Sequence, residues 1–235
     1  MLMTVGCKKP ETSRSYGLET IYTELKNKEK YSTFLDLYDS FGVYVADDEL
    51  SKSYAKAYGV DTLYQYQHGG LPNIACEWPT SSYLNFTALT ALSYSIFAPS
   101  NTAINSFFDS FWKIGGYSSM QEVDALALNY FLYQFIYGGS MLFPEELGDD
   151  ELKNLAGSSL NINPAALNEK TMCVNGALYG MDEIKEPSTF ASVIGPLFQY
   201  KSARSFLYAL LGSSLFSSYV SDLSKYIVLV PTAEQ

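Results

Sequence analysis

The chain has 235 residues, of which 47% are hydrophobic and 17% charged, a composition typical of globular rather than disordered proteins. Its formal net charge of −10 would repel the phosphate backbone of DNA or RNA, so we expect no nucleic-acid partner. The three cysteines argue against a disulfide framework because their number is odd, and the sequence has no apolar run long enough to predict a transmembrane helix.

The N-terminal segment predicts a lipid anchor. A short apolar run ends in Gly6 and Cys7, and polar residues follow. This pattern resembles the end of a bacterial lipoprotein signal, in which the cysteine becomes the lipidated first residue. We therefore interpret residues 1–28 as the remnant of such a signal and a polar tether, with lipidation at Cys7. The alternative is an ordinary disordered terminus that happens to contain a cysteine.

Residues 94–111 predict a buried strand that leads directly into a helix. Ser95 to Ala98 predict a short buried strand, and Pro99 ends it because proline has no N–H to donate to a neighbour. Ser100 is a favourable helix N-cap. The apolar face of the helix follows the spacing i, i+3, i+4 and i+7 and consists of Ile104, Phe107, Phe108 and Phe111.

A similar phrase closes the chain. "YSIFAPSNTA" at 94–103 resembles "YIVLVPTAEQ" at 226–235, and a helix-like segment precedes each copy, at 31–44 and at 203–216. The separation of the two copies is typical of one domain. We therefore expect one complete unit, residues 29–200, and the incomplete start of a second unit.

The first copy is longer than the second between its helix and its strand, which predicts an insertion at about 45–86. Its first part predicts a helix that is capped by Asp47 or Asp48 and ends at Gly59. Loops on a rigid scaffold often carry binding sites, and flat aromatic rings interleaved with amides are typical of sites for sugars or extended polar ligands. The alternative is that these rings form a small core of the insertion itself. The candidate ligand-binding residues are Tyr64, Tyr66, His68, Trp78 and Tyr83.

Three motifs, in order along the chain, resemble those of fasciclin (FAS1) domains. The strand and helix start at 94–108 resemble the first motif of the family, and "LALNYFLYQFIYGG" at 126–139 resembles the next landmark. There Tyr133 and Gln134 occupy the place of the family's Tyr-His pair. The segment 173–199 resembles the closing motif. The residues of the first motif are Phe97, Ala98, Pro99, Ser100 and Asn101.

The closing motif also contains a local turn pattern. Asn175-Gly176 predicts a tight hairpin turn, since both residues tolerate the left-handed backbone conformation that such turns require.

The resemblance implies an α+β fold: a FAS1-like β-sandwich or wedge with flanking helices, here followed by residues 201–235 as the start of a second FAS1-like unit. It also implies a non-catalytic adhesion or binding module of the cell envelope, at the outer membrane or cell surface. The expected partners are a protein or carbohydrate ligand, the membrane through the lipid anchor, and neighbouring envelope proteins. One alternative is an accessory lipoprotein of an outer-membrane system for glycan or nutrient uptake.

Catalytic chemistry is not predicted. His68 is the only histidine of the sequence, so neither a Ser-His-Asp triad nor a multi-histidine metal site can be built. Cys76 and Cys173 have no CxxC partner and are interpreted as buried free thiols, with a disulfide bridge as the alternative that an envelope location would permit. The acidic clusters lack the spacing of a calcium loop. We therefore expect no enzyme activity, no metal and no cofactor, with an undetected hydrolase as the remaining alternative.

Overall fold

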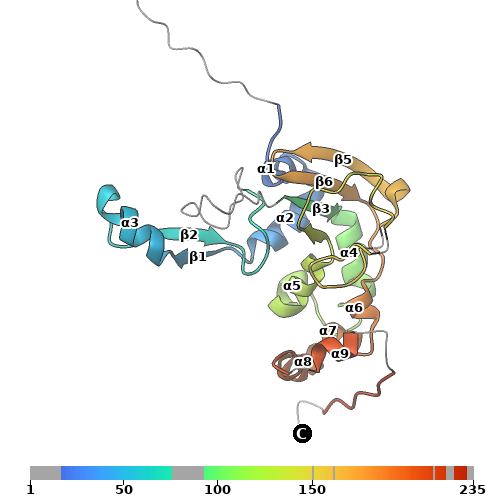
Figure 1. The fold of residues 1–235 in the computed structure, drawn as a ribbon. Helices are drawn as coiled ribbons and strands as arrows, with labels where there is room; N and C mark the ends of the chain where they lie inside the picture. The colour runs from blue at the N-terminus through green and yellow to red at the C-terminus, as the bar shows by residue number, and fades with distance from the viewer. Residues whose placement is uncertain are drawn as a thin grey trace, which may run out of the picture.

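The computed structural model describes residues 17–75, 93–149, 151–160, 162–213, 215–220 and 225–231. Within these residues the protein has an α+β fold, in which a four-stranded sheet and most of the helices form a body (Figure 1). A two-stranded sheet and one helix project from this body as an arm (Figure 1). The described ranges contain no second sheet packed face to face on the first, so they do not show the sandwich layer that the FAS1 resemblance implied.

The helices and strands follow one another in chain order as α1 Ile21–Lys26, η1 Glu29–Tyr31, α2 Ser32–Asp39, β1 Val43–Ala46, α3 Asp48–Tyr58, β2 Tyr64–Gln67, β3 Tyr94–Pro99, α4 Asn101–Ser110, η2 Met120–Glu122, α5 Ala125–Tyr133, β4 Ile136–Gly138, η3 Pro164–Ala166, β5 Leu167–Cys173, β6 Gly176–Met181, α6 Ser188–Ala191, α7 Gly195–Gln199, η4 Lys201–Ala203, α8 Arg204–Leu211 and α9 Phe216–Val220.

The body is built on the sheet with strand order β4-β3-β6-β5. Its two central strands, β3 and β6, run parallel, and the outer strands pair with them antiparallel. All six residues of β6 are buried, as expected for a strand covered on both faces. The predicted strand-to-helix corner is confirmed, because β3 ends at Pro99 and the Ser100 side chain accepts a hydrogen bond from the Ala103 N–H.

The hairpin between β5 and β6 is also present, but its turn lies one residue earlier than predicted. Cys173 pairs with Gly176, so the turn residues are Val174 and Asn175. Gly176 serves a different purpose: a Cβ atom there would lie 1.9 Å from the carbonyl oxygen of Tyr94. The glycine therefore permits the close approach of β3 and β6 rather than the turn itself.

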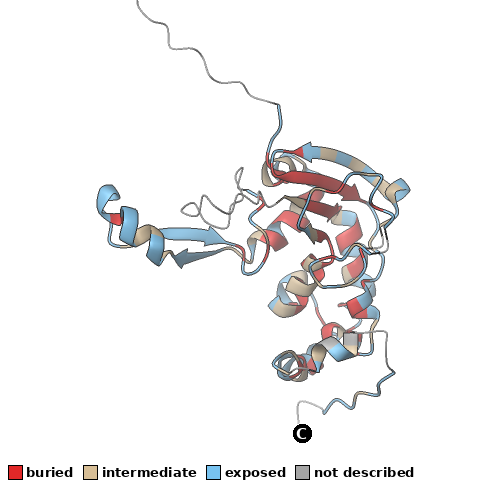
Figure 2. Cartoon of the chain, in the orientation of Figure 1, coloured by how far each residue is buried: buried red, intermediate tan, exposed pale blue. Residues whose placement is uncertain are grey.

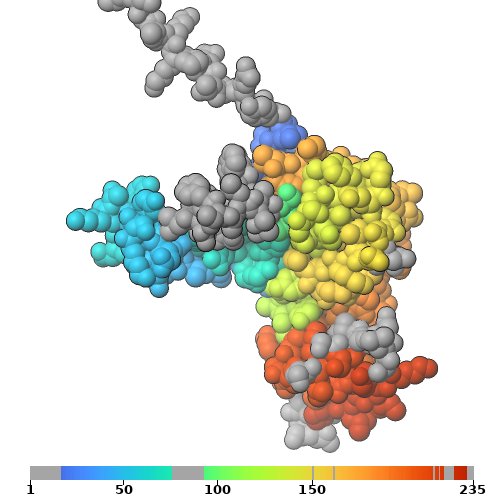
Figure 3. Space-filling model, in the orientation of Figure 1, coloured from blue at the N-terminus to red at the C-terminus, as the bar shows by residue number. Residues whose placement is uncertain are grey.

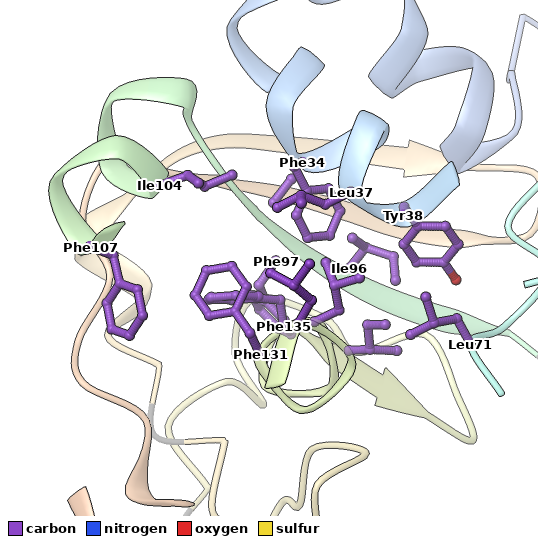
Figure 4. Close-up of a cluster of buried hydrophobic side chains, with 14 of the residues drawn as sticks. Phe34, Leu37, Tyr38, Leu71, Ile96, Phe97, Ile104, Phe107, Phe131 and Phe135 are labelled. Atoms are coloured by element: carbon purple, nitrogen blue, oxygen red, sulfur yellow. The ribbon is translucent and has the colours of Figure 1, made fainter. Parts of the chain in front are cut away.

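Aromatic side chains from two helices fill the core on either side of β3. Phe34 and Leu37 project from α2 toward Ile96 and Phe97, while Phe131 and its neighbours approach from α5 (Figure 4). Phe34 also meets Phe135 edge to face, with ring centroids 6.2 Å apart. Buried residues are concentrated in the body and nearly absent from the arm (Figure 2). No described helix is both long and apolar enough to cross a membrane.

The segment after residue 200 packs on the body. Leu207 and Leu210 of α8 are buried, and both the Arg204 guanidinium and the Tyr208 hydroxyl contact the carboxylate of Asp124, which caps α5. This burial arises because α8 packs against α7 at the end of the body. Leu215 is half exposed.

The second copy of the repeated segment, at 226–235, does not form the predicted strand in its described residues. Residues 225–231 have no assigned strand, and Ile227 and Leu229 are 91% and 85% exposed. The reason is that no described segment offers them a strand to pair with. The assignment of 201–235 to an incomplete second unit stays a prediction.

A charged cluster fastens the N-terminal helices to the edge strand β5. The Glu169 carboxylate lies 2.6 Å from Lys28 Nζ and 2.9 Å from Lys30 Nζ, and it accepts a hydrogen bond from the Tyr31 hydroxyl. Burial by itself would raise the pKa of Glu169, but the hydrogen bonds from Lys28, Lys30 and Tyr31 outweigh it and lower this pKa to about 2. Gly180 makes room for the contact, since a Cβ there would meet the Tyr31 hydroxyl at 1.8 Å.

We predict that Glu169→Gln destabilises the protein at neutral pH. The pKa of Glu169 is lowered from 4.5 to about 2, so the ionised group stabilises the fold above pH 4.5, and this contribution is lost as the pH falls toward 2. The free energy of unfolding, measured by urea denaturation, should drop by about 2 kcal/mol at pH 7. The difference from the unaltered protein should shrink below pH 4.5 and vanish near pH 2.

Glu183→Gln is the matched control, because Glu183 is exposed and forms no ion pair with the described residues. It should leave the free energy of unfolding unchanged. A loss of stability in Glu169→Gln that is the same at pH 7 and pH 2 would contradict the electrostatic explanation.

Candidate functional site

The arm is largely exposed to solvent. It consists of β1, α3 and β2, and all eight strand residues are exposed (Figures 2 and 3). The predicted helix is confirmed: the Asp47 side chain accepts a hydrogen bond from the Leu50 N–H at 2.7 Å, and Gly59 ends the helix with a φ of +68°.

The pairing of β1 with β2 sorts the side chains of the arm onto two faces. Tyr44 lies opposite Tyr66, and Ala46 lies opposite Tyr64, so the three tyrosines share one face, which we call the tyrosine face. The rings of Tyr44 and Tyr66 are 5.0 Å apart. The residues of the opposite face are Val43, Val45, Gln65 and Gln67. The amides that alternate with the aromatics in the sequence therefore point away from them.

The tyrosine face is open to solvent rather than packed. Tyr44 is 74% exposed, Tyr64 60% and Tyr66 40%. These values decide against the alternative that Tyr64 and Tyr66 belong to a small core of the insertion. Sequence reasoning missed Tyr44, although its alternation with Val43 and Val45 is the period-two pattern of a strand and could have indicated it.

His68 continues the same row of side chains but lies at the buried root of the arm. Its ring is 1% exposed and lies 5.0 Å from the ring of Tyr38 and 4.9 Å from that of Tyr66. His68 Nε2 is 3.4 Å from Asp39 Oδ1, and the other oxygen of Asp39 accepts a hydrogen bond from the Tyr22 hydroxyl. His68 therefore packs against Tyr66 at the base of the arm and does not present its ring to a ligand at the surface.

A tight turn at Gly69 and Gly70, which we call the root turn, fixes the arm to α5. Gly69 and Gly70 have φ values of +52° and +94°, and the Leu71 N–H returns a hydrogen bond to the carbonyl of His68. A Cβ on Gly70 would lie 2.9 Å from the Tyr133 hydroxyl, so the turn fits closely against the helix. The Asn129 side chain also donates to the carbonyl of Gly69.

The chain after this turn belongs to the body, although it falls inside the insertion that the sequence predicted at about 45–86. Leu71 is 7% exposed and Ile74 is fully buried. The carbonyl of Ile74 accepts hydrogen bonds from the Tyr22 N–H and from the Asn175 side chain. Within the described part of the predicted insertion, residues 45–75, the projecting segment thus ends at this turn.

The remaining sequence-predicted residues have structural roles or lie outside the described residues. Asn101 accepts a hydrogen bond from the Thr33 N–H and donates to the carbonyl of Glu29, so it joins α4 to α2. Three further residues of the first motif, Phe97, Ala98 and Ser100, are buried. Trp78, Tyr83, Cys7 and Cys76 lie outside the described residues.

Tyr133 and Gln134 do not act together. The Tyr133 ring is half buried beside the root turn. Gln134 is buried, donates to the carbonyl of Tyr130, and accepts a hydrogen bond from the Asn154 side chain at 3.2 Å. The pair thus contacts two different parts of the molecule.

Reactive side chains do not gather at the arm. Burial raises the pKa of the Cys173 thiol to about 12, so this cysteine stays protonated and is a poor nucleophile at neutral pH. Across the described ranges, no three His, Cys, Asp or Glu side chains are grouped to hold a metal ion. What the arm presents is a set of flat, amphipathic rings suited to contact.

The fold and the arm define an α+β body that presents an exposed aromatic hairpin. Comparison of the chain with known proteins finds no matching family model and no matching curated protein. The FAS1 resemblance therefore stays a prediction based on motif order.

We predict that the arm can be shortened without unfolding the body. Replacing residues 47–63 by Asn-Gly would connect Ala46 to Tyr64, which are already paired, through a two-residue turn. The free energy of unfolding, measured by urea denaturation, should change by less than about 1 kcal/mol, since the removed segment is mostly exposed. Ile74→Ala, at a fully buried position beyond the turn, should instead cost about 2–5 kcal/mol. Unfolding of the shortened chain would show that α3 is part of the folding unit.

Proposed function

We propose that the protein is a non-catalytic binding module and that the tyrosine face contacts its ligand. The observation that carries this proposal is the exposure of Tyr44, Tyr64 and Tyr66 side by side on a projecting hairpin. Exposed apolar rings cost solvation free energy, so a contiguous group of them is typical of an interaction surface. Tyrosine is also one of the residues that contribute most to binding free energy at interfaces.

The root of the arm supports the same proposal. A surface binds more tightly when its ligand-free form is already ordered, because less conformational entropy is lost on binding. Here the buried His68, the turn at Gly69 and Gly70, and the buried Ile74 hold the base of both strands. The rings are therefore presented by a hairpin with a fixed base.

The ligand is a protein or a carbohydrate. Flat tyrosine rings can stack on the apolar faces of sugars. Among the described strands β1 and β2 pair only with each other, so the outer edge of each could pair with an extended peptide. The FAS1 resemblance favours adhesion to an envelope or surface partner. The same surface would serve an accessory lipoprotein that captures a glycan for an uptake system, which is the alternative function.

We expect Tyr44→Ala and Tyr64→Ala each to weaken ligand binding about tenfold or more, because each removes an exposed ring from the tyrosine face. A glycan array and a panel of envelope proteins would first identify a ligand, and biolayer interferometry would then measure its Kd. Val45→Ala and Gln65→Ala, on the opposite face, are the matched controls and should change Kd less than twofold. Equal losses on both faces, or no loss on either, would refute the assignment of the site.

The lipid anchor is a separate part of the proposal. If Cys7 is lipidated, the protein expressed in bacteria should partition into the detergent phase, and Cys7→Ala should move it to the aqueous phase. The shift should be nearly complete, because each buried methylene contributes about 0.8 kcal/mol and several acyl chains are attached. Cys173→Ala, at a buried thiol, is the control and should stay in the detergent phase. An aqueous distribution of both proteins would refute the anchor.

A further inference from the structure

A second candidate site lies in the body and shares no residue with the arm. It is a pocket of about 550 Å³ between the C-terminal end of α5, the loop 153–162, the end of β6 and the segment 185–191. Its volume falls within the range of about 300–1,000 Å³ that is typical of sites for small ligands. Among the described residues, these four segments meet only through tertiary folding, so no local pattern predicts the pocket.

Two buried amides form part of its wall. Gln134 is 7% exposed and Asn154 is 6% exposed, and the Asn154 side chain donates to Gln134 Oε1 at 3.2 Å. Asn154 Oδ1 also accepts hydrogen bonds from the N–H groups of Ala156 and Ser158, which fixes the loop around it. Each amide NH₂ group has two hydrogens, and the bonds to described residues engage one of each. Among the described residues, these ordered amides thus keep a donor hydrogen each for ligand hydroxyl groups.

The described lining combines buried apolar side chains with two lysines. Its buried apolar members include Phe135, Leu160 and Met181. Lys153 and Lys185 are exposed members of the lining, and neither forms an ion pair within the part of the chain that the structure describes. Among the described lining residues the acidic one is Glu186, so the two lysines give this set a net positive charge.

This local charge is opposite to that of the whole chain, whose formal net charge is −10. Two lysines without carboxylate partners would be stabilised by an anionic ligand. We infer that the pocket binds a sugar that carries a carboxylate, a uronic acid unit. Its apolar C–H face would contact the apolar lining residues, its hydroxyl groups would accept from the two amides, and its carboxylate would contact the lysines.

The test compares two probes that differ at one position of the sugar ring. Methyl glucuronide carries a carboxylate where methyl glucoside carries a hydroxymethyl group. In NMR titrations of the full chain we expect the side-chain amide signals of Gln134 and Asn154 to shift, with an affinity about tenfold higher for the glucuronide. Acetate, which has the charge without the ring, should bind at least tenfold more weakly than the glucuronide.

The double variant Lys153→Met and Lys185→Met should reduce the affinity for the glucuronide to that for the glucoside. Lys56→Met is the matched control, since Lys56 is an exposed lysine of α3 with no ion pair to any described residue, and it should leave both affinities unchanged. Equal affinity for the two probes, absence of saturable shifts at Gln134 and Asn154, or an unchanged preference in the double variant would each overturn the proposal. Tyr44→Ala should leave the glucuronide affinity unchanged, which separates this site from the tyrosine face.

Discussion

The side chain and backbone of Asn175 join three segments that lie far apart in the sequence. Its Oδ1 accepts a hydrogen bond from the Ile21 N–H at the start of α1, and its Nδ2 donates to the Ile74 carbonyl at 2.7 Å. Its own carbonyl accepts from the Tyr94 N–H at the start of β3. Because the residue is buried, these groups would lose hydrogen bonds without gaining water if the contact were broken. The β5–β6 hairpin thus fixes both the N-terminal helices and the point where the arm rejoins the body.

Local sequence patterns predicted the elements that depend on neighbouring residues. The corner at Pro99 and Ser100 and the limits of α3 followed from capping and from the missing N–H of proline. The turn at Asn175-Gly176 was misplaced because Gly176 is required by the approach of Tyr94, a contact that no local pattern encodes. The contacts of Arg204 and Tyr208 with Asp124 likewise join residues far apart in the sequence, which no local pattern encodes.

The candidate sites likewise combine residues that local patterns predicted with residues that only the tertiary fold brings together. Tyr64 and Tyr66 were found from composition, but which face they share depends on their pairing with β1, so Tyr44 and the opposite orientation of Gln65 emerged from the structure. His68 was predicted as a ligand-binding residue, yet it is buried because Tyr38 of α2 packs against it. The pocket in the body was not predicted from the sequence, because its lining comes from four segments that only the tertiary fold brings together.

The position of the root turn determines how a mechanical load on the arm would pass into the body. A force applied at the tip of the arm acts at a distance from the body. The arm meets the body where Gly69 and Gly70 lie against Asn129 and Tyr133. Part of such a load would thus reach α5, whose apolar face is embedded in the core. The parallel pair β3 and β6 makes no strand pairing with the arm. Tension on the arm would accordingly act on the central ladder indirectly, through this helix contact and through the bond between Asn175 and the Ile74 carbonyl.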